Sequence, residues 1–323
     1  MNLRHLRYFT RIIELGSISQ ASGDLGIAQP ALSKSVMILE QDLGARLLDR
    51  TSHGVTATDA GRRLYDQCQI IFSQVERARA VVADSANTPA GQVTIGMPNS
   101  IANILLMPLL RAVSKELPKI HLQVFQEPRL FLPDRIVSGR MDFGLMVSPS
   151  NLAGLRQVPL VDEKLVFVSG RKLGLDEGAV SPSMIANVPL IMPTRETWLR
   201  VFVESLFLAH SLTLDVRHEV DSTSHYVDCI EANLAATILP SSGIVPIHAK
   251  RRIAINSISD VAFRRTVSFA TAESRILGIA ATQVASLLQQ ITMKIIAAGN
   301  WPGATWLKQT PSAFPSTVRI ARS

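Results

Sequence analysis

Residues 17–44 have the sequence SISQASGDLGIAQPALSKSVMILEQDLG, and this stretch decides the fold of the N-terminal region. Ser17 and Gln20 have the spacing of a capping box, in which each side chain satisfies a backbone N–H of the other residue. The short helix that they begin ends at Gly26. A second helix opens at Gln29-Pro30, where the N–H that proline lacks would be unbonded anyway. A two-turn helix, a tight turn and a longer helix are typical of a helix-turn-helix, whose second helix enters the major groove of DNA.

The helix predicted from residue 29 has two different faces. Four apolar residues recur at steps of four, three and four, which predicts a stripe facing the core: Leu32, Val36, Leu39 and Leu43. The opposite face carries hydrogen-bonding groups and almost no acid: Gln29, Pro30, Ser33, Lys34, Met37 and Gln41. Glutamine can pair with adenine and lysine with guanine, so this face suits base edges. Periodicity alone leaves an equal alternative, a helical hairpin whose polar face is merely solvated.

The flanking segments are consistent with a winged form of this motif. Apolar residues at helical spacing predict a helix over residues 3–15. Residues 47–56 have the pattern of a small hairpin, with Gly54 at its turn. Arg50 and His53, near the tip of this wing, could approach phosphates or the minor groove. A surface ion pair with a neighbouring aspartate is an equal alternative for Arg50.

A long helix follows, and Thr58 and Asp59 favour its start. Six of its residues repeat at steps of four and three, as a heptad seam does: Leu64, Cys68, Ile71, Val75, Ala78 and Val82. Such a seam favours a partner helix and predicts a dimer. A helix of about 28 residues spans about 42 Å, enough to hold two winged domains roughly one turn of DNA apart. The alternative is a monomer that packs this stripe on its own second domain.

A dense set of residues matches a known family at that family's spacing. The matching residues are Leu6-Arg7-Tyr8-Phe9, Gly16-Ser17, Ala21, Leu25, Ile27-Ala28-Gln29-Pro30-Ala31-Leu32-Ser33, Leu39-Glu40, Leu43-Gly44, Leu47, Arg50 and Gly54-Val55-Thr56-Ala57-Thr58-Asp59-Ala60-Gly61. Through them the chain resembles the LysR-type transcriptional regulators, and with Gly91-Gln92-Val93-Thr94-Ile95-Gly96 it is most similar to the nitrogen-assimilation-control subgroup. The resemblance implies that Gln29, Pro30, Ser33 and Lys34 read DNA, with Arg50 and His53 as wing contacts.

The resemblance extends from residue 1 to about residue 295, with two local departures. Ser22 and Gly23 stand in the short helix where the family prefers alanine at the first of them, which would weaken that helix. Asn233-Leu234-Ala235 replaces a usual Gly-x-Gly, which would alter the backbone beside the presumed effector cleft.

Strands and helices alternate from residue 93 to 147, which predicts a parallel sheet with crossover helices. A second set occupies 164–265, and residues 266–296 return to the first. Two such lobes resemble the periplasmic-binding-protein-like effector domain of the family. The predicted fold class is α/β. Its predicted parts are an all-α winged helix-turn-helix at 1–58, a linker and dimerisation helix at 59–87, a two-lobe α/β effector domain at 91–297 and a disordered tail at 298–323. Within the effector domain, lobe I covers 91–161 and 267–297, and lobe II covers 162–266.

Polar residues follow several strands of this domain, where ligands of open α/β sheets settle and helix N-termini offer N–H groups to anions. The candidate effector residues are Asn99, Ser100, Ser148, Thr194, Arg195, Ser222 and Thr223. They predict a small anionic effector, such as a carboxylate, between the lobes. For any single residue, a hydroxyl that caps its own helix, or an arginine that points to solvent, is slightly favoured over an effector contact, whereas for the cluster as a whole the effector contact is favoured.

The composition agrees with a DNA-binding regulator but does not locate its surface. The net charge of the 323 residues is +7, yet residues 1–87 hold ten basic and nine acidic side chains. Two cysteines cannot form a disulfide framework, which fits a reducing compartment, and no apolar run is long enough to span a bilayer, so we expect a cytoplasmic protein. The sequence has no Walker loop, zinc-binding His-Glu-x-x-His, nucleophile elbow or dinucleotide motif, so we expect neither an enzyme nor a cofactor or metal.

The expected function is promoter binding as a dimer or tetramer, biased by an effector, with RNA polymerase as a further partner. One alternative is an effector-independent regulator with a vestigial cleft. Another is a cytosolic solute-binding protein or enzyme on the same two-lobe scaffold. Residues 1–61 argue against this second alternative, because neither activity needs a winged helix-turn-helix.

Overall fold

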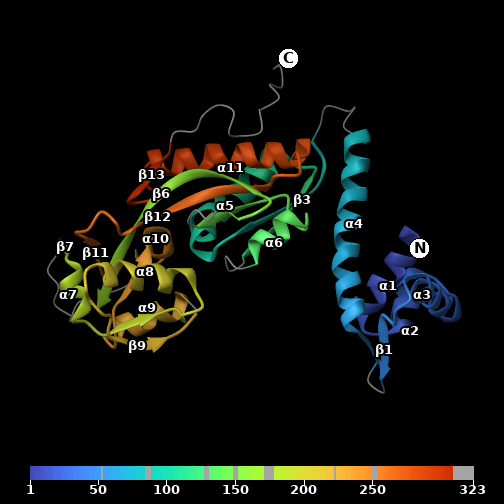
Figure 1. The fold of residues 1–323 in the computed structure, drawn as a ribbon. Coiled ribbons are helices and arrows are strands. Elements are labelled where there is room, and N and C mark those ends of the chain that lie inside the picture. Colours follow the sequence, from blue (N-terminus) through green and yellow to red (C-terminus); the bar gives the residue numbers. More distant parts are fainter. Residues whose placement is uncertain are drawn as a thin grey trace, which may run out of the picture. The chain divides into compact units, whose positions relative to one another are not determined.

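The computed structural model describes residues 1–51, 54–83, 89–126, 131–147, 152–170, 178–221, 223–248 and 253–307. The chain divides into two compact units, Met1–Val82 and Ala83–Ser323 (Figure 1). In the described residues no helix is both long enough and apolar enough to cross a membrane.

The first unit has the predicted order of elements. They are α1 (Leu3–Leu15), α2 (Ile18–Leu25), α3 (Gln29–Leu43), β1 (Leu48–Thr51), β2 (Gly54–Ala57) and α4 (Asp59–Ala83). The Ser17 side chain accepts a hydrogen bond from the Gln20 N–H, as the capping box predicts. The glycines that follow the first three helices all have left-handed backbone conformations, which glycine adopts without steric cost.

The core of the first unit lies between α1, α2, α3 and the start of α4. Three of the four residues in the predicted α3 stripe are buried in it, Leu32, Val36 and Leu39, and the fourth, near the end of the helix, is exposed. The wing is attached at Gly54, next to which the Val55 N–H donates to the carbonyl of Gly16 at 2.8 Å. A Cβ at Gly54 would lie 2.6 Å from that same carbonyl oxygen, so only glycine fits this close approach.

The second unit holds the remaining elements. They are β3 (Gly91–Met97), α5 (Asn99–Glu116), β4 (Ile120–Gln126), α6 (Leu132–Val137), β5 (Phe143–Val147), β6 (Leu155–Gly170), β7 (Ala179–Val180), α7 (Pro182–Ala186), β8 (Leu190–Met192), α8 (Trp198–Ala209), β9 (Val216–Glu219), α9 (Thr223–Glu231), β10 (Thr237–Pro240), α10 (Ser241–His248), β11 (Ile253–Ile258), β12 (Arg264–Ala272), α11 (Ile279–Ala297) and β13 (Ala304–Trp306).

The main sheet of this unit is mixed, and the parallel pairing predicted from residues 93–147 is one part of it. Its strand order is β4-β3-β5-β12-β6-β11-β7, with β10 and β13 also paired to β6. The pairs β3–β4 and β3–β5 are parallel, but β12 is antiparallel to both β5 and β6. Alternating strands and helices reveal local crossovers, but they do not show that β12 returns between β5 and β6. The prediction is therefore confirmed for the first three strands.

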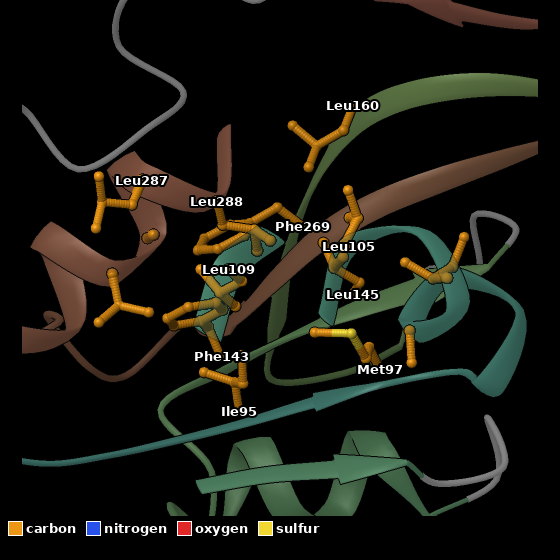
Figure 2. Packing of buried hydrophobic residues seen from close by; sticks show 14 of the residues in the cluster. Ile95, Met97, Leu105, Leu109, Phe143, Leu145, Leu160, Phe269, Leu287 and Leu288 are labelled. Carbon is orange, nitrogen blue, oxygen red and sulfur yellow. The ribbon is translucent and has the colours of Figure 1, made fainter. Parts of the chain in front are cut away.

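The long strands β6 and β12 contribute to several clusters of buried side chains, two of which occupy successive parts of β6. The larger contains buried residues of α5 and α11 together with Phe143 and Phe269, whose ring centroids are 4.9 Å apart (Figure 2). It includes β6 up to Val161 and β12 from Val267, whereas a different cluster includes Leu165 and Phe263. The two strands therefore pass from one core to the other near residues 163 and 265.

The C-terminal segment differs from the prediction. We expected a disordered tail from residue 298, with a cover for a helix end or a subunit contact through its tryptophans as the lesser option. Trp301 is buried in the larger core with 1% of its surface exposed. β13 pairs with β6, and Ala304 lies opposite Glu163. The turn-forming residues of 299–303 hid an ordered strand, because its pairing partner is about 140 residues away in the sequence. Residues 308–323 lie outside the described residues.

Candidate functional site

The predicted DNA-reading residues lie together on one surface of α3. Gln29, Pro30 and Lys34 are exposed and Ser33 is half-buried. No side chain caps the N-terminus of α3, and its first turn contains no acid. An exposed helix N-terminus favours phosphate oxygens, because its first N–H groups have no partner within the helix. The arrangement can therefore meet both a phosphate and base edges.

The acidic residues of α3, Glu40 and Asp42, bond to other groups of the first unit. One carboxylate oxygen of Glu40 accepts the N–H groups of Leu47 at 2.7 Å and Leu48 at 3.3 Å, where β1 begins. Asp42 pairs with the N-terminal amine of Met1 at 2.5 Å. Asp42 is thereby paired with a positive charge, whereas the Glu40 carboxylate is held by backbone N–H groups at the start of the wing.

The wing forms as predicted, but only its backbone can be related to the predicted contacts. Arg50 lies in β1 opposite Val55 of β2. The side chain of Arg50, and the whole of His53, lie outside the described residues, so their contacts with DNA stay predictions. The Thr58 hydroxyl accepts the Gly61 N–H at 3.0 Å and donates to the carbonyl of Arg46 at 2.7 Å, which fixes the start of α4 behind the wing.

The predicted dimer seam of α4 is divided along its length. Cys68 is fully buried in the winged core, and Leu64 and Ile71 pack against that core. Burial raises the pKa of the Cys68 thiol to about 11. Cys68 therefore has no surface to offer a partner helix, contrary to the expectation from its heptad position. The sequence could not show this, because a heptad stripe does not reveal which surface it packs against.

The later seam positions differ from the earlier ones. Val75 is half-buried and Ala78 is exposed. The side chain of Val82 lies outside the described residues. Unlike Leu64 and Ile71, Val75 and Ala78 are not part of the winged core, which leaves them available to a partner helix.

In the second unit, Asn99 and Ser100 form the start of α5, as predicted. The Ser100 hydroxyl accepts a hydrogen bond from Nη2 of Arg265 at 2.9 Å. The same nitrogen donates to the hydroxyl of Ser242, at the start of α10, at 3.1 Å. Arg265 therefore joins the beginnings of two helices, a role that the sequence analysis missed.

Arg265 is held by a buried carboxylate. Its Nε donates to Oε2 of Glu163 at 2.8 Å, and the Glu163 side chain is completely buried. The other oxygen, Oε1, accepts from the Ser242 N–H at 2.5 Å, the Ser241 hydroxyl at 3.2 Å and Nε1 of Trp301 at 3.1 Å. A buried ion pair needs such additional hydrogen bonds to offset the loss of hydration. The two residues are opposite each other in the β6–β12 ladder, a register that a single strand pattern cannot show.

The remaining described candidates lie after β8. The Thr194 N–H and hydroxyl both donate to Oδ1 of Asp221 at 3.0 Å, so Thr194 closes the loop onto the end of β9. Arg195 is 76% exposed, with Glu204 at 3.9 Å. The loop is supported by the buried Arg200, which donates to the carbonyl of Pro193 at 3.2 Å and pairs with Glu219 at 3.0 Å.

The structure brings together only part of the predicted effector set. Among the described residues, Ser100 bonds to Arg265, whereas Thr194 bonds to Asp221 and Arg195 lies near Glu204. Ser148 and Ser222 lie outside the described residues, as does the side chain of Thr223 at the start of α9. Among the residues that the structure describes, no group of three or more His, Cys, Asp or Glu side chains could hold a metal ion.

Comparison with known proteins matches both units. Residues 3–62 match the bacterial regulatory helix-turn-helix protein, lysR family, and residues 86–292 match the LysR substrate binding domain. The nitrogen assimilation regulatory protein nac of Klebsiella aerogenes is 35% identical over 243 residues, which is 75% of this chain and 79% of that protein.

Solved structures show the same fold. Full-length CbnR in complex with its target DNA is 20% identical and matches with a TM-score of 0.69 over 91% of this chain and 99% of that one. Full-length OxyR from Pseudomonas aeruginosa, also 20% identical, has a TM-score of 0.71 over 96% of this chain and 99% of that one. The two family matches account for the helix-turn-helix unit and for most of the α/β unit. The chain therefore belongs to the LysR family of bacterial transcriptional regulators, DNA-binding proteins with an effector-binding domain rather than enzymes.

Proposed function

We propose that the polar face of α3 reads promoter DNA through Gln29, Pro30, Ser33 and Lys34, with Arg50 and His53 of the wing on the backbone or minor groove. The observation that supports this best is the division of α3 into two faces. Leu32, Val36 and Leu39 are buried, while the opposite face carries the exposed Gln29, Pro30, Lys34, Met37 and Gln41. The first turn of α3 contains no acid, so no negative charge there opposes a phosphate.

Lys34→Ala tests this proposal. If Lys34 bonds a guanine edge, its loss should cost about 1 to 3 kcal/mol at one base pair and relax the preference there. The measurement is the affinity for a set of duplexes that differ at single positions. Lys119→Ala, an exposed lysine of the second unit, is the control and should change none of these affinities. An equal loss for every sequence would show that Lys34 touches only phosphate.

We also propose that the chain self-associates, as a dimer or tetramer, through the accessible part of the α4 seam around Val75 and Ala78. Val75→Asp should lower the mass measured by light scattering and weaken operator binding together, because a buried carboxylate opposes helix pairing. Gln74→Asp places the same charge on the neighbouring exposed residue and should leave the mass unchanged. An unchanged mass for Val75→Asp would exclude this seam.

The effector that we propose is a small anion, such as a carboxylate, bound near Asn99, Ser100, Thr194 and Arg195, with Ser148, Ser222 and Thr223 as further contacts. The support is that no side chain caps the N-terminus of the 18-residue helix α5, while Arg265 lies beside it. An effector would act by favouring one arrangement of the protein over another. The alternative is a regulator that needs no effector.

Calorimetric titration with a panel of small carboxylates and amino acids separates these alternatives. We expect one compound to bind, and Ser100→Ala to weaken it by about tenfold through loss of one hydrogen bond. Ser114→Ala, exposed on the same helix, is the matched control. Absence of binding by every compound, with DNA binding intact, would favour the effector-independent regulator.

We also propose a regulated pathway and a cellular location from the similarity to two nitrogen assimilation regulators. Because proteins named for nitrogen assimilation regulation are 35% and 34% identical to this chain, we assign it to that subgroup and place it in the cytoplasm, where promoter DNA is found. RNA polymerase is a further proposed partner, since it binds the same promoters. Genomic footprinting would test the assignment, because bound sites away from nitrogen-assimilation genes would contradict it.

A further inference from the structure

Met37 is an exposed apolar side chain on the otherwise polar face of α3. It is 49% exposed, whereas Leu32, Val36 and Leu39 of the same helix are 4% exposed or less. Single exposed apolar residues are common on protein surfaces and need no function. A function for Met37 is therefore inferred from its position among the proposed DNA-reading residues.

Helical geometry puts Met37 near the centre of the polar face. Successive residues of an α-helix turn by about 100°, so Met37 lies about 40° around the axis from Ser33. Gln29 lies about 40° from Ser33 in the opposite direction. Lys34 lies about 100° from Ser33, on the same side as Met37. Met37 is also about 6 Å farther along the axis than Ser33, within the span of a helix that lies in the major groove.

The surroundings of Met37 suit a small apolar group. A shallow hollow is lined by Ser33, Lys34, Val36, Met37 and Glu40. The Glu40 carboxylate, which would repel a base acceptor, is engaged by the N–H groups of Leu47 and Leu48. In the major groove, the apolar group that base edges present is the 5-methyl group of thymine.

We propose that Met37 is a specificity-determining residue that contacts a thymine methyl group in each half-site. This inference rests on the proposed function and extends it from hydrogen-bonding residues to an apolar contact. The flexible, polarisable methionine side chain can follow the methyl group without exact shape matching. Met37 therefore adds preference for thymine over cytosine, whose edge lacks the methyl group.

The test removes the methyl group from the DNA and the side chain from the protein. Duplexes bound by the wild-type protein are first selected from a random pool, and each thymine of the selected half-site is then replaced singly by deoxyuridine. The wild-type protein should lose affinity by about fourfold at one thymine, the value expected for one buried methyl group. Met37→Ala should bind the two duplexes equally at that position and keep its response at all others.

Met293→Ala removes a similarly exposed methionine from another long helix, α11, and should retain the full response to deoxyuridine. A thermal melt of Met37→Ala matching the wild type would show that the fold is intact. If Met37→Ala keeps the same penalty at every thymine, or if no thymine methyl affects wild-type binding, the inference is wrong. Either result would leave the proposed function standing as long as the wild-type protein enriches a sequence; failure to enrich any sequence would overturn the proposed function itself.

Discussion

Replacing Glu163 with alanine is expected to lower the free energy of unfolding of the second unit by about 3 to 5 kcal/mol, the cost of removing one partner of a buried ion pair. Glu163 is completely buried and Arg265 nearly so. Without the carboxylate, the guanidinium would remain in the interior with only hydroxyl groups as acceptors. The donors of Ser242 and Trp301 would also lose their acceptor.

Urea unfolding followed by tryptophan fluorescence measures this change selectively, because all three tryptophans, Trp198, Trp301 and Trp306, lie in the second unit. Glu116→Ala, an exposed glutamate at the end of α5, should change the midpoint little. Glu163→Leu combined with Arg265→Met should recover much of the loss, since apolar residues of similar volume often replace a buried pair at little cost. A midpoint for Glu163→Ala equal to that of wild type would contradict the buried network.

Trp301→Ala should destabilise the same unit by about 3 to 5 kcal/mol, because it empties a large site in the core. The indole packs among the buried residues of the larger cluster, and its Nε1 donates to Glu163. Trp301→Phe keeps most of the packing but removes the donor, so a smaller loss of about 1 to 3 kcal/mol is expected.

The unfolding midpoint in urea, monitored through the two remaining tryptophans, distinguishes these cases. Val261→Ala, a change at an 88% exposed apolar residue of the same unit, is the control and should have almost no effect. If residues 298–307 did not belong to the folded unit, Trp301→Ala would also be neutral. That result would contradict the burial of Trp301 and the pairing of β13 with β6.

The fold of the first unit could be predicted because its signals are local. The capping residues at Ser17, the glycines after each helix and the stripe from Leu32 to Leu39 each lie within one or two helical turns. One of the departures from the family pattern, Asn233, is also explained locally. Asn233, which replaces a usual glycine, has a positive φ of 57°, and asparagine tolerates that conformation better than most residues.

The parts that were missed depend on pairing between distant segments. β6 is one continuous strand from Leu155 to Gly170, but only its second half has a recognisable strand pattern, because the first half holds polar residues beside buried ones. Glu163, Arg265 and Trp301 come from three segments that meet only in the folded sheet. No periodicity within a single segment reveals such a contact.

The same distinction applies to the candidate sites. The proposed DNA-reading face lies on a single helix, so residue spacing was enough to predict that its residues lie together. The effector residues come from loops that are far apart in sequence, and spacing could not show that Ser100 is engaged by Arg265, or Thr194 by Asp221. Likewise, the heptad spacing of α4 could not reveal that Cys68 belongs to the core of its own unit.

The central claim is that the exposed face of α3 discriminates between base sequences. The most direct measurement is fluorescence anisotropy of a labelled duplex, selected by the purified protein, in competition with unlabelled bulk DNA at moderate and fixed ionic strength. We expect the protein to bind the selected duplex at least about 1,000-fold more tightly than bulk DNA. Equal competition by bulk DNA, base pair for base pair, would contradict this expectation.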